Sequence, residues 1–138
     1  MATKVVHSPG KRKRCIARAT ITEGKGDYRI NSLLLDVHPS AIAKEKIRLP
    51  LILASGHVDP KTIDIRITVQ GGGVMGQSDA IASAIARALV EWTGSEELLS
   101  KYLHYDRTLI AGDHRLTEPH KPSHSSQGPR ARRQKSYR

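Results

Sequence analysis

The alternation of hydrophobic and polar side chains is most regular between residues 62 and 70. Every second position in this stretch is aliphatic, and the positions between are polar. A period of two with one apolar side is typical of a strand that has one buried face and one solvated face, in an antiparallel or mixed sheet. The sequence therefore predicts a strand over 62–70. Its inward positions are Ile63, Ile65, Ile67 and Val69.

Two further strands are predicted closer to the N-terminus. Residues 15–22 are rich in β-branched and small apolar side chains, and 27–31 alternate again, with Tyr28 and Ile30 on one side. Between them, residues 23–26 carry two glycines, which supply the positive φ angles of a turn. This order predicts a β-hairpin over 15–31.

Three stretches have a helical pattern. The first covers 41–48 and is ended or kinked by Pro50. The second begins with Ser78 as its N-cap and ends at Gly94, and the third begins with Ser95 as its N-cap. The inward positions are Ile81, Ala84, Ile85, Ala88, Leu89 and Trp92 in the second helix, and Leu98, Leu99, Tyr102 and Leu103 in the third.

The positive charge of the chain is concentrated at its two ends. The 138 residues include 23 Lys and Arg against 13 Asp and Glu, a net charge of +10. Residues 1–18 and 119–138 each hold six basic side chains and no acidic one, so the middle of the chain is close to neutral. Two like-charged ends repel each other, and their natural partner is a polyanion such as nucleic acid. The plainer alternative is that both ends are solvated and only aid solubility.

Composition indicates how such a partner would be bound. Aromatic residues make up only 4% of the chain, with no Phe, so base stacking on aromatic rings is not the expected mode. Contacts to phosphate and sugar are expected instead. Residues 119–138 contain three prolines and almost no apolar side chains, so this segment is predicted to be disordered until a partner surrounds it.

A glycine-rich segment follows the predicted strand. Gly71, Gly73 and Gly76 satisfy the dinucleotide pattern G-x-G-x-x-G, and 71–78 nearly matches a phosphate-binding P-loop with Gln77 in place of its lysine. The missing charge, and the lack of room for a second strand with a catalytic acid, weaken a nucleotide-enzyme interpretation. Two compatible interpretations stay open: a tight turn that needs small residues, and an anion site made of backbone N–H groups.

Nothing else in the sequence indicates catalysis, a metal or a cofactor. His114, His120 and His124 lie in coil without fixed geometry, and Cys15 is interpreted as a core residue at the start of a strand. One cysteine excludes an internal disulfide. No apolar run approaches a membrane span or a secretory signal. The expectation is a soluble, reduced, intracellular protein.

Three sequence blocks occur in one order and carry a resemblance to a known family, the universal small-subunit ribosomal protein number nine. The final four residues are similar to its archaeal and eukaryotic branch. The blocks are GKRKRCIARA (10–19) with GKG (24–26), GGGVMGQSDAI (71–81) running into IARAL (85–89), and DHRLTE (113–118) leading to ARRQKSYR (131–138).

The resemblance implies a fold and a location. The fold is α+β, a two-layer mixed sheet with helices on one face, like the second domain of ribosomal protein five. The residues themselves predict a flexible basic N-terminal arm over 1–14, a globular domain over 15–118 and an extended basic tail over 119–138, and the resemblance implies the same organisation. The implied place is the head of the small subunit in the cytoplasmic ribosome, beside other head proteins, with the tail reaching the tRNA in the peptidyl site.

The resemblance also implies site residues, with no catalytic, metal or small-molecule site among them. The tRNA-binding residues would be Lys135, Ser136, Tyr137 and Arg138. The ribosomal-RNA-binding residues would be Lys11, Arg12, Lys13, Arg14, Arg18, Gly71, Gly72, Gly73, Gly76, Gln77, Arg115, Lys121, Arg130, Arg132 and Arg133. Two alternatives remain from the residues themselves: a general architectural nucleic-acid binder, and a nucleotide-binding enzyme that uses 71–78.

Overall fold

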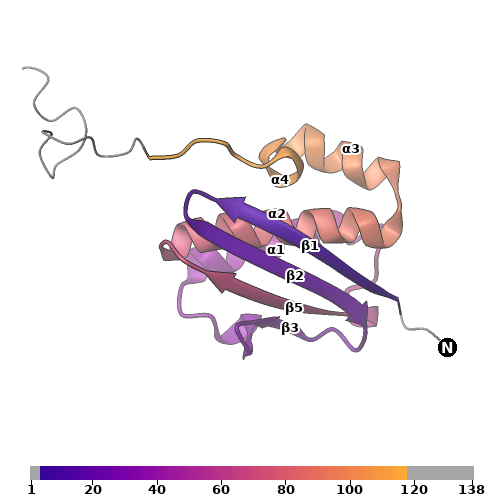
Figure 1. Ribbon diagram of the computed structural model, residues 1–138. Helices are drawn as coiled ribbons and strands as arrows, with labels where there is room; N and C mark the ends of the chain where they lie inside the picture. Colours follow the sequence, from indigo (N-terminus) through magenta and orange to yellow (C-terminus); the bar gives the residue numbers. More distant parts are fainter. Residues whose placement is uncertain (1–3, 118–138) are drawn as a thin grey trace, which may run out of the picture.

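Five strands form one mixed sheet in the computed structural model, which describes residues 4–117 (Figure 1). The strand order is β1-β2-β5-β3-β4. Neighbouring strands are antiparallel except for β3 and β5, which run parallel. The strands are β1 (Val5–Arg12), β2 (Cys15–Glu23), β3 (Tyr28–Ile30), β4 (Leu33–Leu34) and β5 (Ile63–Gln70).

Helices cover one face of this sheet. Figure 1 shows α1 and α2 behind the strands, with α3 and α4 against α2 at the upper edge, so the domain has the two α+β layers that the resemblance implied. Among residues 4–117, no helix is both long and apolar enough to cross a membrane. The helices are α1 (Ala41–Ala54), α2 (Val74–Thr93), α3 (Glu96–Tyr105) and α4 (Thr108–Ala111), with short 3-10 turns at Leu35–Val37 and Pro60–Thr62.

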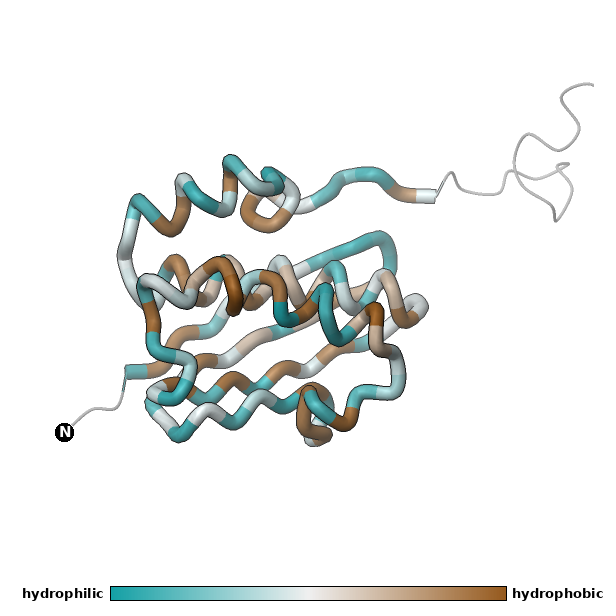
Figure 2. Tube along the Cα trace, turned by 180° about the vertical axis from the view of Figure 1, so that it is seen from behind, coloured by the Kyte–Doolittle hydropathy of each residue, from teal (hydrophilic) through white to brown (hydrophobic). Residues whose placement is uncertain are grey.

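The core lies between the sheet and α2. The predicted alternation of β5 is confirmed, because all four of its aliphatic side chains are buried and the residues between them are not. Burial alternates in the same way along β1 and β2, although the hydropathy of their residues does not follow the same strict period (Figure 2). The helix side of the core is built from small residues, since Ala80, Ala84 and Ala88 are fully buried beside Ile81 and Leu89. Small side chains let the helix backbone approach the strands closely.

The closest approach is between α2 and Gly10 of β1. A Cβ atom at Gly10 would lie 2.0 Å from the Ala80 carbonyl oxygen and 2.7 Å from the Ala84 backbone nitrogen. Backbone atoms of a regular helix cannot move aside as a flexible side chain can. This contact therefore fixes where α2 crosses β1, and it requires glycine at position 10.

The predicted flexible arm over 1–14 is wrong for its described part. Val5–Arg12 form the edge strand β1, paired with β2 from Val5–Thr22 to Arg12–Cys15. The sequence carries only a weak indication of this strand, because Pro9 and Gly10 normally indicate a turn. Pro9 is tolerated because β1 is an edge strand, and Gly10 is required by α2.

The predicted hairpin over 15–31 is also wrong, although both of its strands exist. β5 lies between β2 and β3, so the two are not paired with each other. The turn between them is fixed to β5 instead. The Asp64 carboxylate accepts hydrogen bonds from the backbone N–H groups of Lys25, Gly26 and Asp27 at 2.8–3.0 Å. That carboxylate ties the turn to β5, so the chain passes along β5 instead of folding back on β2.

Helix boundaries differ from the prediction at two places. α1 does not end before Pro50 but continues to Ala54, because Ile47, Pro50 and Ala54 are buried on one side of it. This burial outweighs the roughly 3 kcal/mol that proline costs inside a helix. α2 begins at Val74 with Gly73 as its N-cap, so Ser78 is not the cap. Ser78 is buried within the helix and donates its hydroxyl hydrogen bond to the Met75 carbonyl.

The remaining helix predictions are mostly confirmed. Gly94 ends α2 in the left-handed conformation (φ 64), and the Ser95 hydroxyl accepts from the Leu98 N–H at 3.3 Å as the N-cap of α3. Leu98 and Tyr102 are buried as expected, but Leu103 is exposed, which corrects its predicted inward position. α4 was not predicted, because four residues are too few to show a helical period.

We expect Gly10→Ala to lower the free energy of unfolding by about 1–3 kcal/mol, since the added methyl group meets the backbone of α2. Urea unfolding of the full chain measures this. Gly56→Ala is the matched control, because a Cβ atom there meets nothing within 4 Å. Equal effects of the two substitutions would contradict the argument.

Candidate nucleic-acid interface

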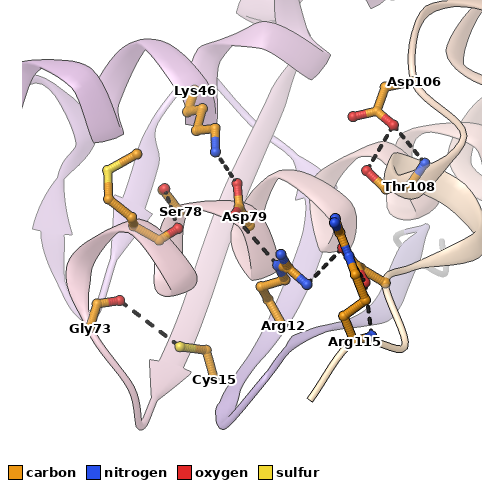
Figure 3. A network of polar contacts seen from close by, with 11 residues as sticks. Arg12, Cys15, Lys46, Gly73, Ser78, Asp79, Asp106, Thr108 and Arg115 are labelled. Carbon is orange, nitrogen blue, oxygen red and sulfur yellow. Dashed lines mark hydrogen bonds and ion pairs between the residues drawn. The ribbon is translucent and has the colours of Figure 1, made fainter. Parts of the chain in front are cut away.

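Three stretches that are distant in sequence meet at one end of the sheet. They are the β1–β2 turn at Lys13 and Arg14, the 71–73 loop between β5 and α2, and the 112–117 segment that follows α4 (Figures 1 and 3). A Cβ atom at Gly71 would lie 2.5 Å from the Arg14 carbonyl oxygen, so the loop touches the turn. We call this region the basic end. Its basic side chains are Lys11, Arg12, Lys13, Arg14, Arg87, Arg107, His114 and Arg115.

The glycine loop is packed around the side chain of Cys15. Gly71 and Gly72 have positive φ angles of 80° and 65°. A Cβ atom would come within 2.1 Å of the Cys15 sulfur at Gly72 and within 2.9 Å of it at Gly76. Cys15 is buried, which confirms it as a core residue. The glycines therefore have a packing role, one of the two roles that the sequence left open.

The start of α2 faces outward beside this packing. Gly73 is the N-cap without a side-chain hydrogen bond, and space around it is open, with nothing within 4 Å of a Cβ atom there. Val74 and Met75 are exposed. Gln77 donates from Nε2 to the Gly71 carbonyl at 3.0 Å, so it braces the loop and is not directed at a ligand. The first backbone N–H groups of a long helix attract anions when they remain without protein partners.

Arg12 does not point into solvent with the other cations. Its Nη1 lies 2.7 Å from the Asp113 carboxylate and its Nε lies 3.7 Å from Asp79, which also pairs with Lys46 (Figure 3). The Arg12 side chain is 19% exposed and that of Asp113 only 9%. Arg12 is thus engaged by two carboxylates inside the protein, and its geometry is that of an anchor.

Asp113 fixes the segment that follows α4. Its carboxylate accepts from the backbone N–H of Arg115 at 2.9 Å and from the Arg115 guanidinium at 2.6–3.0 Å. These hydrogen bonds, with the nearby charge of Arg12, hold the pKa of Asp113 well below its usual range. We call the Arg12–Asp113–Arg115 arrangement the clasp. It ties β1 to the stretch that leads into residues 118–138.

Arg87 of α2 makes a second connection at the same place. Its Nε donates to the Ile110 carbonyl at 2.7 Å and its Nη1 donates to the Pro9 carbonyl at 3.0 Å. One guanidinium therefore joins α2, α4 and β1. α4 itself begins where the Asp106 carboxylate accepts from the N–H and hydroxyl of Thr108, both at 2.8 Å.

A shallow hollow of about 620 Å³ lies beside this connection. Its only acidic side chain among the described residues is Asp113, which the clasp already occupies. The hollow therefore presents a cationic surface suited to phosphate groups. Sequence reasoning missed Arg87, Arg107 and His114, because single basic residues in or beside helices give no distinct signal. The basic side chains that line the hollow are Lys11, Arg87, Arg107, His114 and Arg115.

The basic end brings together most of the predicted site residues that the structure describes. Arg18 is the exception, because it lies on the sheet face away from the helices, opposite Pro9 and Thr68. The residues gathered at the basic end are Lys11, Arg12, Lys13, Arg14, Gly71, Gly72, Gly73, Gly76, Gln77 and Arg115. Those outside the described residues are Lys121, Arg130, Arg132, Arg133, Lys135, Ser136, Tyr137 and Arg138.

A domain that gathers cations at one end while its nearby acids are held in internal ion pairs is typical of a protein that assembles with a polyanion. Comparison with known proteins identifies the class: the chain is a ribosomal protein, a structural constituent of the small ribosomal subunit and not an enzyme. It belongs to the family described as Ribosomal protein S9/S16, whose profile matches residues 10–138.

The similarity to individual relatives extends over nearly the whole chain. The chain is 53% identical over 135 residues to the small ribosomal subunit protein uS9 of Methanococcus maripaludis (strain C7), covering 98% of this chain and 99% of the relative. It is 52% identical over the same length to the protein of that name from Methanococcus vannielii. Both relatives are archaeal, in agreement with the branch that the last four residues predicted.

The clasp predicts a specific dependence on pH. Because the pKa of Asp113 is lowered in the folded state, its carboxylate stabilises the fold above the ordinary Asp pKa of about 4, and this contribution is lost as the pH falls further. We expect Asp113→Asn to be less stable than the natural chain at pH 7, with the difference shrinking below about pH 4. Urea unfolding over a pH series measures this.

Arg12→Gln provides the control for the clasp in a double-mutant cycle. Arg12 and Asp113 share one ion pair, so the double variant should lose less stability than the sum of the two single variants. Two results would contradict the clasp. One is that the losses in free energy of unfolding add in the double variant, and the other is that the difference in this free energy between Asp113→Asn and the natural chain stays constant with pH.

Proposed function

We propose that this small-subunit protein docks its basic end on ribosomal RNA in the subunit head and extends residues 119–138 to the tRNA in the peptidyl site. The observation that carries the proposal is the convergence of the β1–β2 turn, the 71–73 loop and the 112–117 segment at one cationic end. The chain leaves the described domain from this same end (Figure 1). Docking there would lead the basic C-terminal segment directly onto RNA.

Electrostatics supports a phosphate partner over a protein partner. Lys13 and Arg14 are exposed at the tip of a two-residue turn, with φ 53 at Lys13, and they form no ion pair among the described residues. Asp79 and Asp113 near them are held by Arg12, Lys46 and Arg115. Arginine binds phosphate through two parallel hydrogen bonds, and lysine supplies a compact charge.

We assign Arg12 a different role from its neighbours. Its two carboxylate contacts favour anchoring of the 113–115 segment over direct contact with RNA. The first turn of α2, at Gly73, is proposed as a further place for an RNA phosphate, because no side chain caps it, Val74 and Met75 are exposed, and the adjoining Gly71 lies against Arg14.

The C-terminal segment is long enough to contact RNA well beyond the described domain. Residues 119–138 carry six basic side chains and no acidic one, and twenty residues extend to about 65 Å at most. We propose that Lys121, Arg130, Arg132 and Arg133 bind ribosomal RNA along the way. Lys135, Ser136, Tyr137 and Arg138 would then lie nearest the tRNA.

The salt dependence of binding tests the basic end. The affinity for RNA falls as the salt concentration rises. We expect Lys13→Gln/Arg14→Gln to reduce the magnitude of the slope of log affinity against log salt by about two, because each lost phosphate contact reduces it by about one. Filter binding of the full chain to small-subunit ribosomal RNA over a salt series measures the slope. Lys61→Gln, exposed in the turn before β5, should leave it unchanged.

Two results would contradict the basic end as an RNA site. One is an unchanged slope in the double variant. The other is equal affinity of the natural chain for duplex DNA and for ribosomal RNA, which would favour a general architectural binder.

Removal of residues 135–138 tests the tRNA contact separately. The described domain loses no core residue, so its stability and its affinity for ribosomal RNA should stay nearly unchanged. Small subunits assembled with the shortened chain should release tRNA from the peptidyl site faster. Measurement of tRNA dissociation from these subunits checks this, and unchanged dissociation would rule the contact out.

A further inference from the structure

The second face of the sheet is open in the part of the chain that the structure describes. α1 and α2 pack on one face, and Figure 1 shows β1, β2 and β5 uncovered on the other. Side chains at alternate positions of these strands point outward, as their burial patterns show. This surface is separate from the helix-side core and adjoins the basic end at the β1–β2 turn.

Three arginines lie side by side on this face, one on each of three strands. Arg29 of β3 is directly opposite Arg66 of β5. Arg66 pairs with Thr20, two positions along β2 from Arg18, so Arg18 and Arg66 are diagonal neighbours about 7–8 Å apart. All three side chains are exposed. We call them the open-face arginines.

The stability of the sheet does not explain this arrangement. Like charges on neighbouring strands repel and destabilise a sheet. Asp27 offsets part of the charge of Arg29 at 3.4 Å, but Arg18 and Arg66 form no ion pair with any carboxylate among residues 4–117. Asp64 on the same face accepts from three backbone N–H groups, and these hydrogen bonds, with a smaller effect from the charge of Arg66, hold its pKa below the usual range. Asp64 thus offsets part of the charge of Arg66 without forming an ion pair with it. The repulsion would be relieved by an external polyanion.

The shape and lining of the face agree with such a ligand. One hollow of about 670 Å³ lies beside Arg29 and Arg66, and its two carboxylates, Asp27 and Asp64, are engaged by Arg29 and by backbone N–H groups. A second of about 330 Å³ lies beside Arg14, Arg18 and Gln70. Thr68 lines both, so the two hollows adjoin, and the second reaches the basic end through Arg14.

We propose that the open-face arginines bind the sugar–phosphate backbone of an RNA segment that continues from the basic end. The inference rests on the proposed function and adds a second RNA surface to it. The guanidinium groups would each donate two hydrogen bonds to phosphate oxygens, and the side chains of Gln70 and Thr68 would donate to phosphate or ribose oxygens. Asn31 is not among these donors, because its amide is hydrogen-bonded to the backbone of Val69.

An RNA backbone fits this surface better than a protein does. The stable centre of a protein interface is apolar and desolvated, often with aromatic anchors. The hollows here are lined mainly by polar and charged side chains. The exposed large apolar residues are Val5 and Ile16 on the long strands and Leu34 of β4 opposite Arg29, and they are too scattered to form an apolar centre. The side chain of Tyr28 is half-buried and donates to the Pro60 carbonyl at 2.6 Å, so it offers no stacking platform.

Arg18→Gln/Arg66→Gln in the full chain tests the proposal. We expect the salt slope of binding to small-subunit ribosomal RNA to fall by about two, with a loss of affinity of about tenfold or more at moderate salt. Lys44→Gln/Lys61→Gln removes the same charge from α1 and from the turn before β5, and should leave the slope unchanged. Far-UV circular dichroism and urea unfolding check that each variant is folded.

A second variant tests the same surface without removing a cation. Thr68→Glu places a carboxylate where the two hollows meet, and should weaken RNA binding by a similar factor. Unchanged binding in both open-face variants, while Lys13→Gln/Arg14→Gln still lowers the slope, would overturn this inference and leave the proposed function standing.

Two other outcomes would also overturn the inference. Open-face variants that bind RNA normally but no longer co-sediment with small subunits would assign the face to a protein neighbour. If none of the variants, including Lys13→Gln/Arg14→Gln, changes the slope, the proposed function itself fails, and this extension fails with it.

Discussion

The contact between the backbone of α2 and Gly10 determines the geometry of the rest of the domain. With backbone atoms this close, α2 has one position over β1, and its start is brought next to the β1–β2 turn. Cys15 then fills the space among the glycines that precede the helix. Farther along, Arg87 is placed where it reaches both β1 and the end of α4. The basic end is therefore a consequence of how one small-residue helix is seated on a strand.

Cations at the basic end are divided between two tasks. Some are neutralised within the protein, as in the clasp, where a nearly buried Asp113 holds Arg12 and Arg115. Others, such as Lys13 and Arg14, stay exposed. In the proposed docking on RNA both tasks would serve assembly, because the internal pairs fix the direction of the chain and the exposed cations would supply attraction. A uniformly basic surface would supply the attraction without the fixed direction.

Local patterns in the sequence were enough to predict the elements but not their pairing. The period of β5 is a property of a few consecutive residues and was predicted correctly. The predicted inward positions of α2 are buried except Trp92, which is half-buried, but burial is continuous over 80–86 because α2 also packs against α1 and α4. The neighbours of β3 depend on Asp64, which lies 37–39 residues along the chain from the turn that it binds, and no local pattern contains that information. The start of α2 was misplaced because glycines in its first turns resemble a loop.

In the candidate site, too, local features could be predicted from the sequence and tertiary contacts could not. Clusters of basic residues such as Lys13 and Arg14 are visible in the sequence, and so were predicted. The engagement of Arg12 by Asp79 and Asp113 is a tertiary property, as is the gathering of Arg18, Arg29 and Arg66 on one sheet face. The family resemblance supplied identity and location, but not these contacts.

The edge position of β1 has a consequence for the protein before it meets RNA. An exposed edge strand offers unpaired N–H and C=O groups to which another chain can add, a common start of aggregation. At Pro9 there is no N–H group to offer, and its outward carbonyl is already occupied by Arg87. The middle of this edge is thus closed to strand addition. Addition of a second copy along the full length of β1 is thereby disfavoured before the protein joins the subunit.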